Sequence, residues 1–159
     1  MKGIVLTVSD RVSRGEAEDR SGPAAAAKLS LFGFAGTEVR VVEDGVASVR
    51  DALLELVEAH DLVVTTGGTG FSLRDLTPEG TRLVIEREAP GLAEAMRAAT
   101  FGRMSHGMLS RGVAGIVGST LIINLPGSVK AVEESLDVVG PALKHAIELL
   151  IGGRTDHNG

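Results

Sequence analysis

The sequence predicts a three-layer α/β/α fold, in which helices cover both faces of a mostly parallel sheet. Short apolar segments alternate with segments of helical spacing along the chain, which is the order that a parallel sheet requires. These apolar segments are nearly continuous, as expected for strands buried on both faces. Two of them, 113–117 and 120–125, are joined only by Gly118-Ser119, which predicts a hairpin with a type II′ turn. One hairpin strand must run antiparallel, and we expect it near an edge of the sheet.

The first half of the chain contains three of the predicted strands, the first of them rich in β-branched residues. Pro23 stands where the first turn of a helix tolerates proline, and Ser48 with Asp51 resembles a capping box at the start of another helix. The predicted elements are a strand at 3–9, a long polar loop at 10–21, a helix at 24–31, a strand at 37–42, a helix at 48–57 and a strand at 61–66.

The second half of the chain predicts helices before and after the hairpin. Thr77 is a candidate helix cap, followed by Pro78 at the first helical position. Gly140-Pro141 divides the last stretch of helical spacing in two, because proline breaks the interior of a helix. We therefore predict one domain over 1–152 and a flexible tail over 153–159. The predicted elements are a helix at 78–87, a helix at 91–101, a loop at 101–111, the hairpin, and helices at 128–139 and 141–151.

Composition and charge exclude several classes of protein. A length of 159 residues fits one domain, and a net charge of −5 argues against a nucleic-acid binder, which would carry a basic face. Cysteine is absent, which excludes disulfides, zinc–thiolate sites, iron–sulfur clusters and thiol nucleophiles. No apolar run reaches the roughly 18 residues of a membrane span, and no signal-peptide pattern precedes the first strand. We therefore expect a soluble, cytoplasmic protein without membrane or nucleic-acid partners.

A glycine-rich segment, Thr65-Thr66-Gly67-Gly68-Thr69-Gly70, directly follows a predicted strand. Ligands bind open α/β sheets at the carboxyl ends of strands, and glycine lets backbone N–H groups turn toward an anion. The segment is neither a Walker A loop nor a dinucleotide-binding fingerprint, because the spacing of both motifs is absent. A tight turn without any ligand is the alternative explanation.

Charged and polar residues lie at the ends of the other predicted strands and at the helix that starts near Thr77. Taken singly, each has an ordinary explanation as a turn, a solvated salt bridge or a helix cap. Because parallel strands end at the same edge of a sheet, we expect these residues to converge there. Carboxylates beside oxyanion donors suit a metal–nucleotide complex and a second phosphate-bearing substrate. The residues expected at this edge are Ser9, Asp10, Asp44, Arg74, Asp75, Lys130 and the segment 124–128.

Several motifs occur in one order along the chain: Ser9-Asp10, Glu18-Asp19-Arg20-Ser21-Gly22, Thr65-Thr66-Gly67-Gly68-Thr69-Gly70, Arg74-Asp75-Leu76-Thr77-Pro78-Glu79, Ser110-Arg111-Gly112 and Asn124-Leu125-Pro126-Gly127-Ser128. Together they resemble the MogA/MoaB molybdopterin-binding family, which includes the G domain of gephyrin. The resemblance extends over nearly the whole chain, from residue 2 to residue 151.

The resemblance implies a molybdopterin adenylyltransferase of molybdenum cofactor biosynthesis. Such enzymes use Mg-ATP to place AMP on the terminal phosphate of molybdopterin and release pyrophosphate. Asp44 and Asp75 correspond to two acidic residues important for catalysis, and we expect them to hold Mg²⁺ or to position the reacting phosphates. The resemblance also assigns a set of residues that bind substrate or nucleotide: Ser9, Asp10, Thr66, Gly67, Gly68, Thr69, Gly70, Arg74, Ser110, Asn124, Pro126, Gly127, Ser128 and Lys130.

The same resemblance leaves two other functions open. Some MoaB-type members bind molybdopterin without adenylylating it, and scaffold relatives suggest an oligomerisation module. The expected partners are the molybdenum insertase, the molybdopterin synthase and further copies of the chain, in a homotrimer or a hexamer. The sequence does not distinguish a molybdenum pathway from a tungsten pathway.

Overall fold

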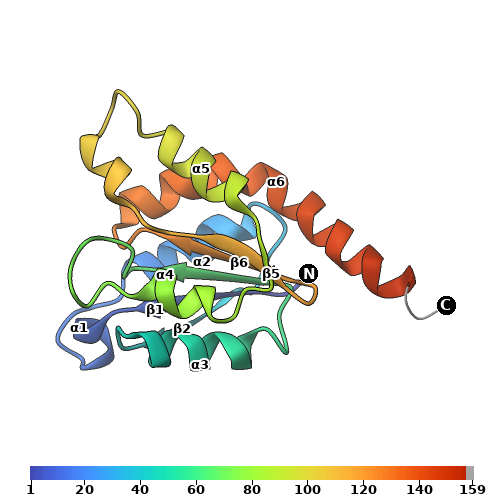
Figure 1. Cartoon of the computed structure of the whole chain (residues 1–159), viewed down its shortest axis with the longest axis horizontal. Coiled ribbons are helices and arrows are strands. Elements are labelled where there is room, and N and C mark those ends of the chain that lie inside the picture. Colours follow the sequence, from blue (N-terminus) through green and yellow to red (C-terminus); the bar gives the residue numbers. More distant parts are fainter. Residues whose placement is uncertain (157–159) are drawn as a thin grey trace.

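A computed structural model describes residues 1–156, and it places a six-stranded sheet between two layers of helices (Figure 1). The strand order is β2-β1-β3-β6-β5-β4. β1, β2, β3 and β6 run parallel to one another, whereas β5 is antiparallel to both of its neighbours. The predicted fold class is therefore confirmed. The strands are β1 (Gly3–Val8), β2 (Glu38–Val42), β3 (Leu62–Thr66), β4 (Arg87–Glu88), β5 (Ala114–Val117) and β6 (Thr120–Leu125).

The sheet separates two apolar cores. On one face, α2 (Ser21–Ser30), α5 (Pro90–Ala98) and α6 (Val129–Asp156) pack against the strands. On the other face lie α3 (Val46–Leu56) and α4 (Thr77–Arg82). Every residue of the central strands β3 and β6 is buried, which explains their continuous apolar sequence.

The register of the parallel strands brings their carboxyl ends to one edge of the sheet. Val8 of β1 lies opposite Val42 of β2, and Thr66 of β3 lies opposite both Thr7 and Leu125. The loops that follow these four strands therefore emerge side by side, as the sequence predicts.

The hairpin between β5 and β6 has the predicted two-residue turn. Gly118 has a φ of +56°, and no non-glycine residue described here, Ser119 included, has a positive φ. A positive φ at the first turn position alone is the signature of a type II′ turn. The antiparallel strand β5 lies next to the short edge strand β4.

The prediction of two helices divided at Pro141 is wrong, because α6 is one helix that contains Pro141. Its buried residues continue at helical spacing on both sides of the proline, with Leu136 before it and Leu143 after it fully buried. A proline inside a helix costs about 3 kcal/mol, and burial of this long apolar face outweighs that cost. α6 also extends beyond residue 152 through Asp156, so most of the predicted tail is helical; residues 157–159 lie outside the described part.

Several local details also differ from the prediction. The expected loop at 10–21 begins with a short helix, α1 (Asp10–Ser13), and the loop at 101–111 contains a 3₁₀ helix, η1 (Ser105–Leu109). The helix predicted to reach residue 87 ends at Arg82, because the chain then extends to pair with β5. Ser48 lies inside α3 rather than at its cap, and its hydroxyl donates to the carbonyl oxygens of Glu43 and Gly45. None of the helices within residues 1–156 is both long and apolar enough to cross a membrane.

Candidate active site

The glycine-rich loop after β3 requires glycine at two consecutive positions. Gly67 has a φ of +90° and Gly68 a φ of +68°, a region that residues with a Cβ rarely adopt. A Cβ on Gly67 would lie 2.5 Å from the carbonyl oxygen of Val8, and one on Gly68 would lie 2.2 Å from Oγ1 of Thr77. The loop is thus held against both the end of β1 and the start of α4.

This loop presents three backbone N–H groups that can bind an anion. The N–H of Gly67 donates to the carbonyl oxygen of Leu125 (3.2 Å) and is therefore used within the fold. The N–H groups of Gly68, Thr69 and Gly70 have no acceptor among the described residues. Within the segment predicted to bind an anion, the N–H groups that remain available are therefore those of residues 68–70.

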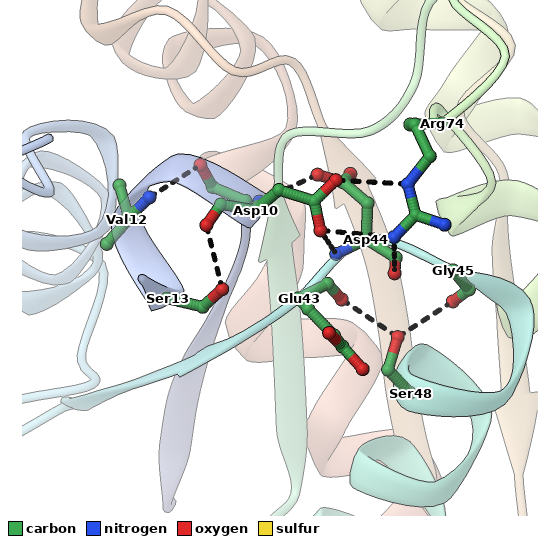
Figure 2. A network of polar contacts seen from close by, with 9 residues as sticks. Asp10, Val12, Ser13, Glu43, Asp44, Gly45, Ser48 and Arg74 are labelled. Atoms are coloured by element: carbon green, nitrogen blue, oxygen red, sulfur yellow. Dashed lines mark hydrogen bonds and ion pairs between the residues drawn. The ribbon is translucent and has the colours of Figure 1, made fainter. Parts of the chain in front are cut away.

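Asp44 is fixed at the end of β2 so that one carboxylate oxygen stays free. Its Oδ2 accepts a hydrogen bond from the N–H of Asp10 (2.8 Å), as Figure 2 shows. Its Oδ1 has no hydrogen-bond partner in the described part of the chain and lies 3.2 Å from the position of a Cβ on Gly68. Burial raises the pKa of Asp44, and the negative charges of Asp10 and Asp75 add to this effect.

Asp75 has a similar arrangement on the far side of the loop. Its Oδ2 accepts from the N–H of Ser72 (3.1 Å) and lies 2.8 Å from the position of a Cβ on Gly70. Its Oδ1 has no partner among residues 1–156. The two carboxylates that the sequence singles out therefore flank the same three free N–H groups, and each has one unpaired oxygen.

Two cavities, each of about 450 Å³, meet at this point. Asp75 borders both of them, together with Gly68, Gly127 and Ser128, whereas Asp44 borders only the second. The first cavity extends between α5, η1 and α6, and residues that line it include Thr69, Gly70, Met96, Arg97, Ser110, Asn124 and Pro126. The second extends between the ends of β1 and β2 and the start of α2, and residues that line it include Thr7, Ser9, Asp19, Ser21, Thr66 and Gly67.

Asp10, Arg74 and Lys130 are predicted to bind substrate, yet they border neither of these cavities. The guanidinium of Arg74 donates from Nε to Oδ2 of Asp10 (3.0 Å) and from Nη2 to Oδ1 of Asp10 (3.1 Å). This ion pair holds the pKa of Asp10 below its ordinary value, the hydrogen bond from Arg74 being the main cause. The side chains of Asp10 and Arg74 thus face each other rather than a cavity (Figure 2).

Two other predicted residues have clear local roles besides lining a cavity. The Nδ2 group of Asn124 donates to the hydroxyls of Thr65 and Thr81, each at 3.0 Å, and its Oδ1 accepts from the N–H of Val113. Ser128 caps α6, because its Oγ accepts from the N–H of Ala131 (3.2 Å). The helix-cap explanation that the sequence leaves open for this serine therefore holds.

Sequence reasoning assigned no role to Arg111, although it fastens the loop that carries Asp75. Its Nε donates to the carbonyl oxygen of Gly70 (2.9 Å), its Nη2 donates to that of Asp75 (2.5 Å), and its guanidinium pairs with the carboxylate of Glu79. This pairing lowers the pKa of Glu79. Its motif, Ser110-Arg111-Gly112, does not indicate these partners, so only the three-dimensional contacts show its role.

Asp19 is the second residue without an assigned role. It borders the second cavity, and its carboxylate accepts from the hydroxyl of Thr7 (2.8 Å) and from the N–H of Gly22 (2.9 Å). These contacts tie the start of α2 to β1. A carboxylate beside Ser21-Gly22 is a weak signal in sequence because such residues are common in turns.

The donor set fits a magnesium ion bound together with phosphates. No cluster of three or more His, Cys, Asp or Glu side chains suited to a metal occurs in the described residues. Mg²⁺ is commonly held by one or two carboxylates plus substrate phosphates and water rather than by an all-protein cage. Asp44 and Asp75 match that requirement, because each has one unpaired carboxylate oxygen and lies next to the loop 68–70, with Oδ1 of Asp44 near Gly68 and Oδ2 of Asp75 near Gly70.

The fold and the site define an α/β protein whose free N–H groups and carboxylates at the carboxyl edge of the sheet suit an anionic ligand bound with a metal ion. The family described as "Probable molybdopterin binding domain" matches residues 4–145. The chain belongs to this molybdopterin-binding family, which confirms the resemblance seen in the sequence.

Individual relatives are similar over most of the chain. A molybdopterin adenylyltransferase of Helicobacter pylori is 41% identical over 93% of this chain and 86% of its own length. Gephyrin of Dictyostelium discoideum is 43% identical over 92% of this chain, but the chain spans only 22% of that protein. The Mog protein of Mycobacterium ulcerans has a solved structure with a TM-score of 0.87 and 42% identity, covering 94% of this chain and 98% of that one.

Proposed function

We propose that this protein is a molybdopterin adenylyltransferase of molybdenum cofactor biosynthesis. It would transfer AMP from Mg-ATP to the terminal phosphate of molybdopterin and release pyrophosphate. The observation that carries the proposal is the placement of two carboxylates, Asp44 and Asp75, around three unpaired N–H groups where two cavities meet. The name of the similar Helicobacter pylori protein supports the same activity.

In the proposed reaction, a phosphate oxygen of molybdopterin attacks the α-phosphorus of ATP. A new phosphorus–oxygen bond forms to the pterin phosphate, and the bond to the bridging oxygen of pyrophosphate breaks. No covalent intermediate with the protein is needed. Transfer of this kind depends on positioning and on neutralising the phosphate charges, which the N–H groups of Gly68, Thr69 and Gly70 support by donating to phosphate oxygens.

The two carboxylates would hold the magnesium ion through their unpaired oxygens. When bound, Mg²⁺ neutralises charge on the phosphates and orients them. The raised pKa of Asp44 reflects burial beside two other negative charges, and a cation at this point would relieve that repulsion. Asp75 borders both cavities, so it would lie next to the phosphates of both substrates.

The two cavities would take one substrate each, so that their phosphates meet at the shared wall. Gly127 belongs to this wall, and a Cβ on it would lie 3.3 Å from Cα of Gly67, so the two loops touch. We propose substrate contacts for the predicted residues that border a cavity: Ser9, Thr66, Gly67, Gly68, Thr69, Gly70, Ser110, Asn124, Pro126, Gly127 and Ser128. Lys130 lies outside these walls, so we assign it no contact.

The test is to incubate the protein with molybdopterin and Mg-ATP and to measure adenylylated molybdopterin and pyrophosphate. Equal amounts of both products are expected. If ATP remains intact and no adenylylated product forms, the proposed adenylyltransferase activity is rejected. Calorimetric binding of molybdopterin without binding of Mg-ATP would then identify a binding protein instead.

An Asp75→Asn variant separates catalysis from folding. The change keeps the size of the side chain and an oxygen that can accept from Ser72, so we expect a change in Tm of only about 2 °C or less. Turnover should fall at least about 100-fold because one metal-binding charge is lost. Parallel losses of turnover and stability would contradict a catalytic role.

The proposal also covers the oligomeric state, the location in the cell and the partner enzymes. We propose a homotrimer or a hexamer in the cytoplasm that passes its product to a molybdenum insertase and takes its substrate from a molybdopterin synthase. Light scattering of the purified protein tests the oligomer, and a mass of one chain, 16.4 kDa, would reject it.

A further inference from the structure

A cross-connection between three strand ends surrounds Asp44. Asp10 follows β1, Asp44 follows β2, and Arg74 lies in the loop that follows β3. The N–H of Asp10 donates to Oδ2 of Asp44 (2.8 Å), and the N–H of Asp44 donates to Oδ1 of Asp10 (3.1 Å). The two aspartates therefore hold each other by a reciprocal pair of hydrogen bonds (Figure 2).

Arg74 closes this connection from the third strand end. Its guanidinium binds both carboxylate oxygens of Asp10, and its Nη2 also donates to the carbonyl oxygen of Asp44 (2.8 Å). Asp44 is thereby held at its N–H, at its carbonyl oxygen and at Oδ2. Only Oδ1 is left, and it faces Gly68 of the anion-binding loop.

The exposure of Arg74 speaks against a large contribution of this ion pair to folding stability. The side chain of Arg74 is 57% exposed, whereas that of Asp10 is 16% exposed. Ion pairs that involve exposed arginine side chains contribute little to stability. The fork of a guanidinium is nevertheless well suited to fix geometry, because it binds a carboxylate through two parallel hydrogen bonds.

We propose that Asp10 and Arg74 are positioning residues that aim the free oxygen of Asp44 at the ligand, and that neither touches substrate. This inference rests on the proposed function for its kinetic consequence and revises the sequence prediction that both residues bind substrate. It follows from the contacts in Figure 2 and from the absence of both side chains from the walls of the two cavities.

The experiment compares Arg74→Ala and Arg74→Lys with a matched control. Arg82 of α4 also makes an ion pair at 3.0 Å, with Glu88, and its side chain is also 57% exposed. Arg82→Ala and Arg82→Lys therefore remove an ion pair with an equally exposed arginine that borders neither cavity. We expect all four variants to keep the Tm of the unchanged protein within about 3 °C.

The first readout needs no activity. Hydrogen exchange of the backbone N–H groups of Asp10 and Asp44, followed by NMR, should accelerate roughly fivefold or more in Arg74→Ala and stay unchanged in the Arg82 variants, because local opening controls exchange. Unchanged exchange at both N–H groups would overturn the inference whatever the protein catalyses.

The second readout is the kinetics of adenylyl transfer. A misplacement of about 1 Å at a reacting centre can cost about 100-fold, so kcat of Arg74→Ala should fall about 10- to 100-fold while KM for ATP and for molybdopterin changes less than about threefold. Arg74→Lys should not restore kcat, because an ammonium cannot form the fork. A rise in either KM with unchanged kcat would show direct substrate contact and overturn the inference. If the unchanged protein makes no product, the proposed function is rejected. The hydrogen exchange of Asp10 and Asp44 then decides by itself whether Arg74 positions Asp44.

Discussion

Replacement of Gly68 by alanine tests whether the anion-binding loop is as tightly held as its contacts indicate. The added Cβ would lie 2.2 Å from Oγ1 of Thr77 and 3.2 Å from Oδ1 of Asp44. Thr77 cannot move away easily, because it is fully buried and its hydroxyl donates to the carbonyl oxygen of Gly67 (2.9 Å). The backbone of residue 68 also keeps a φ of +68°.

The expected loss of stability has two parts. A positive φ costs a residue with a Cβ about 1–2 kcal/mol, and overfilling a packed site costs about 1–3 kcal/mol. The sum is about 2–5 kcal/mol in the free energy of unfolding. For a domain of this size about 1 kcal/mol corresponds to about 2–4 °C, so Tm should fall by about 5–15 °C.

Gly36→Ala is the matched control, measured beside Gly68→Ala by calorimetry. Gly36 has a φ of +75°, but a Cβ there would meet nothing within 4 Å. The control should therefore show only the backbone part, about 1–2 kcal/mol. An equal loss of Tm in the two variants would refute the contact argument. Adenylyl transfer should fall about 100-fold in Gly68→Ala alone, because displacement of the loop moves both the N–H groups and Asp44.

Three further variants test the charges and hydrogen bonds of the site. Asp44→Asn should lose nearly all transferase activity yet raise Tm at pH 7. The raised pKa of Asp44 means that its ionised form destabilises the folded protein, so the gain in Tm should vanish as the pH falls toward 3.8. Calorimetry at a series of pH values measures this gain. Glu79→Gln should make the free energy of unfolding depend less on pH in the acid range. The lowered pKa of Glu79 stabilises the wild type above about pH 4.5, and this stabilisation is lost as the pH falls further. Equal stabilities of the wild type and the variant at neutral pH would contradict this account. Asn124→Ala should cost about 2–4 kcal/mol in urea unfolding, because it removes the donors to Thr65 and Thr81; a loss below about 1 kcal/mol would contradict the buried network.

The fold was predictable largely because the sheet is simple in sequence. The strands β3 and β6 are buried on both faces, so their apolar runs stand out. The hairpin was predictable from Gly118-Ser119, because few links of two residues are compatible with the twist of a sheet. Pro141 misled the prediction, since the cost of a proline is local whereas the burial that outweighs it extends from Val132 to Ile151 of α6.

The site was predictable in its parts but not in its connections. The convergence of the glycine-rich loop, Asp44 and Asp75 follows from the parallel order of the strands alone. The ion pair between Asp10 and Arg74 joins residues 64 positions apart, and nothing in the sequence shows whether a charged side chain faces a ligand or another side chain. Arg111 was missed for the same reason, because its role consists of contacts with carbonyl oxygens that any residue type would present.

The wall shared by the two cavities has a consequence for inhibitor design. Both cavities are bordered by the same four residues, Gly68, Asp75, Gly127 and Ser128. A compound with two ring systems could therefore place one ring system in each cavity, with a short anionic linker lying against these shared residues. Tethering the two halves makes the second binding event intramolecular. Such a two-headed compound would discriminate against proteins that recognise only one of the halves.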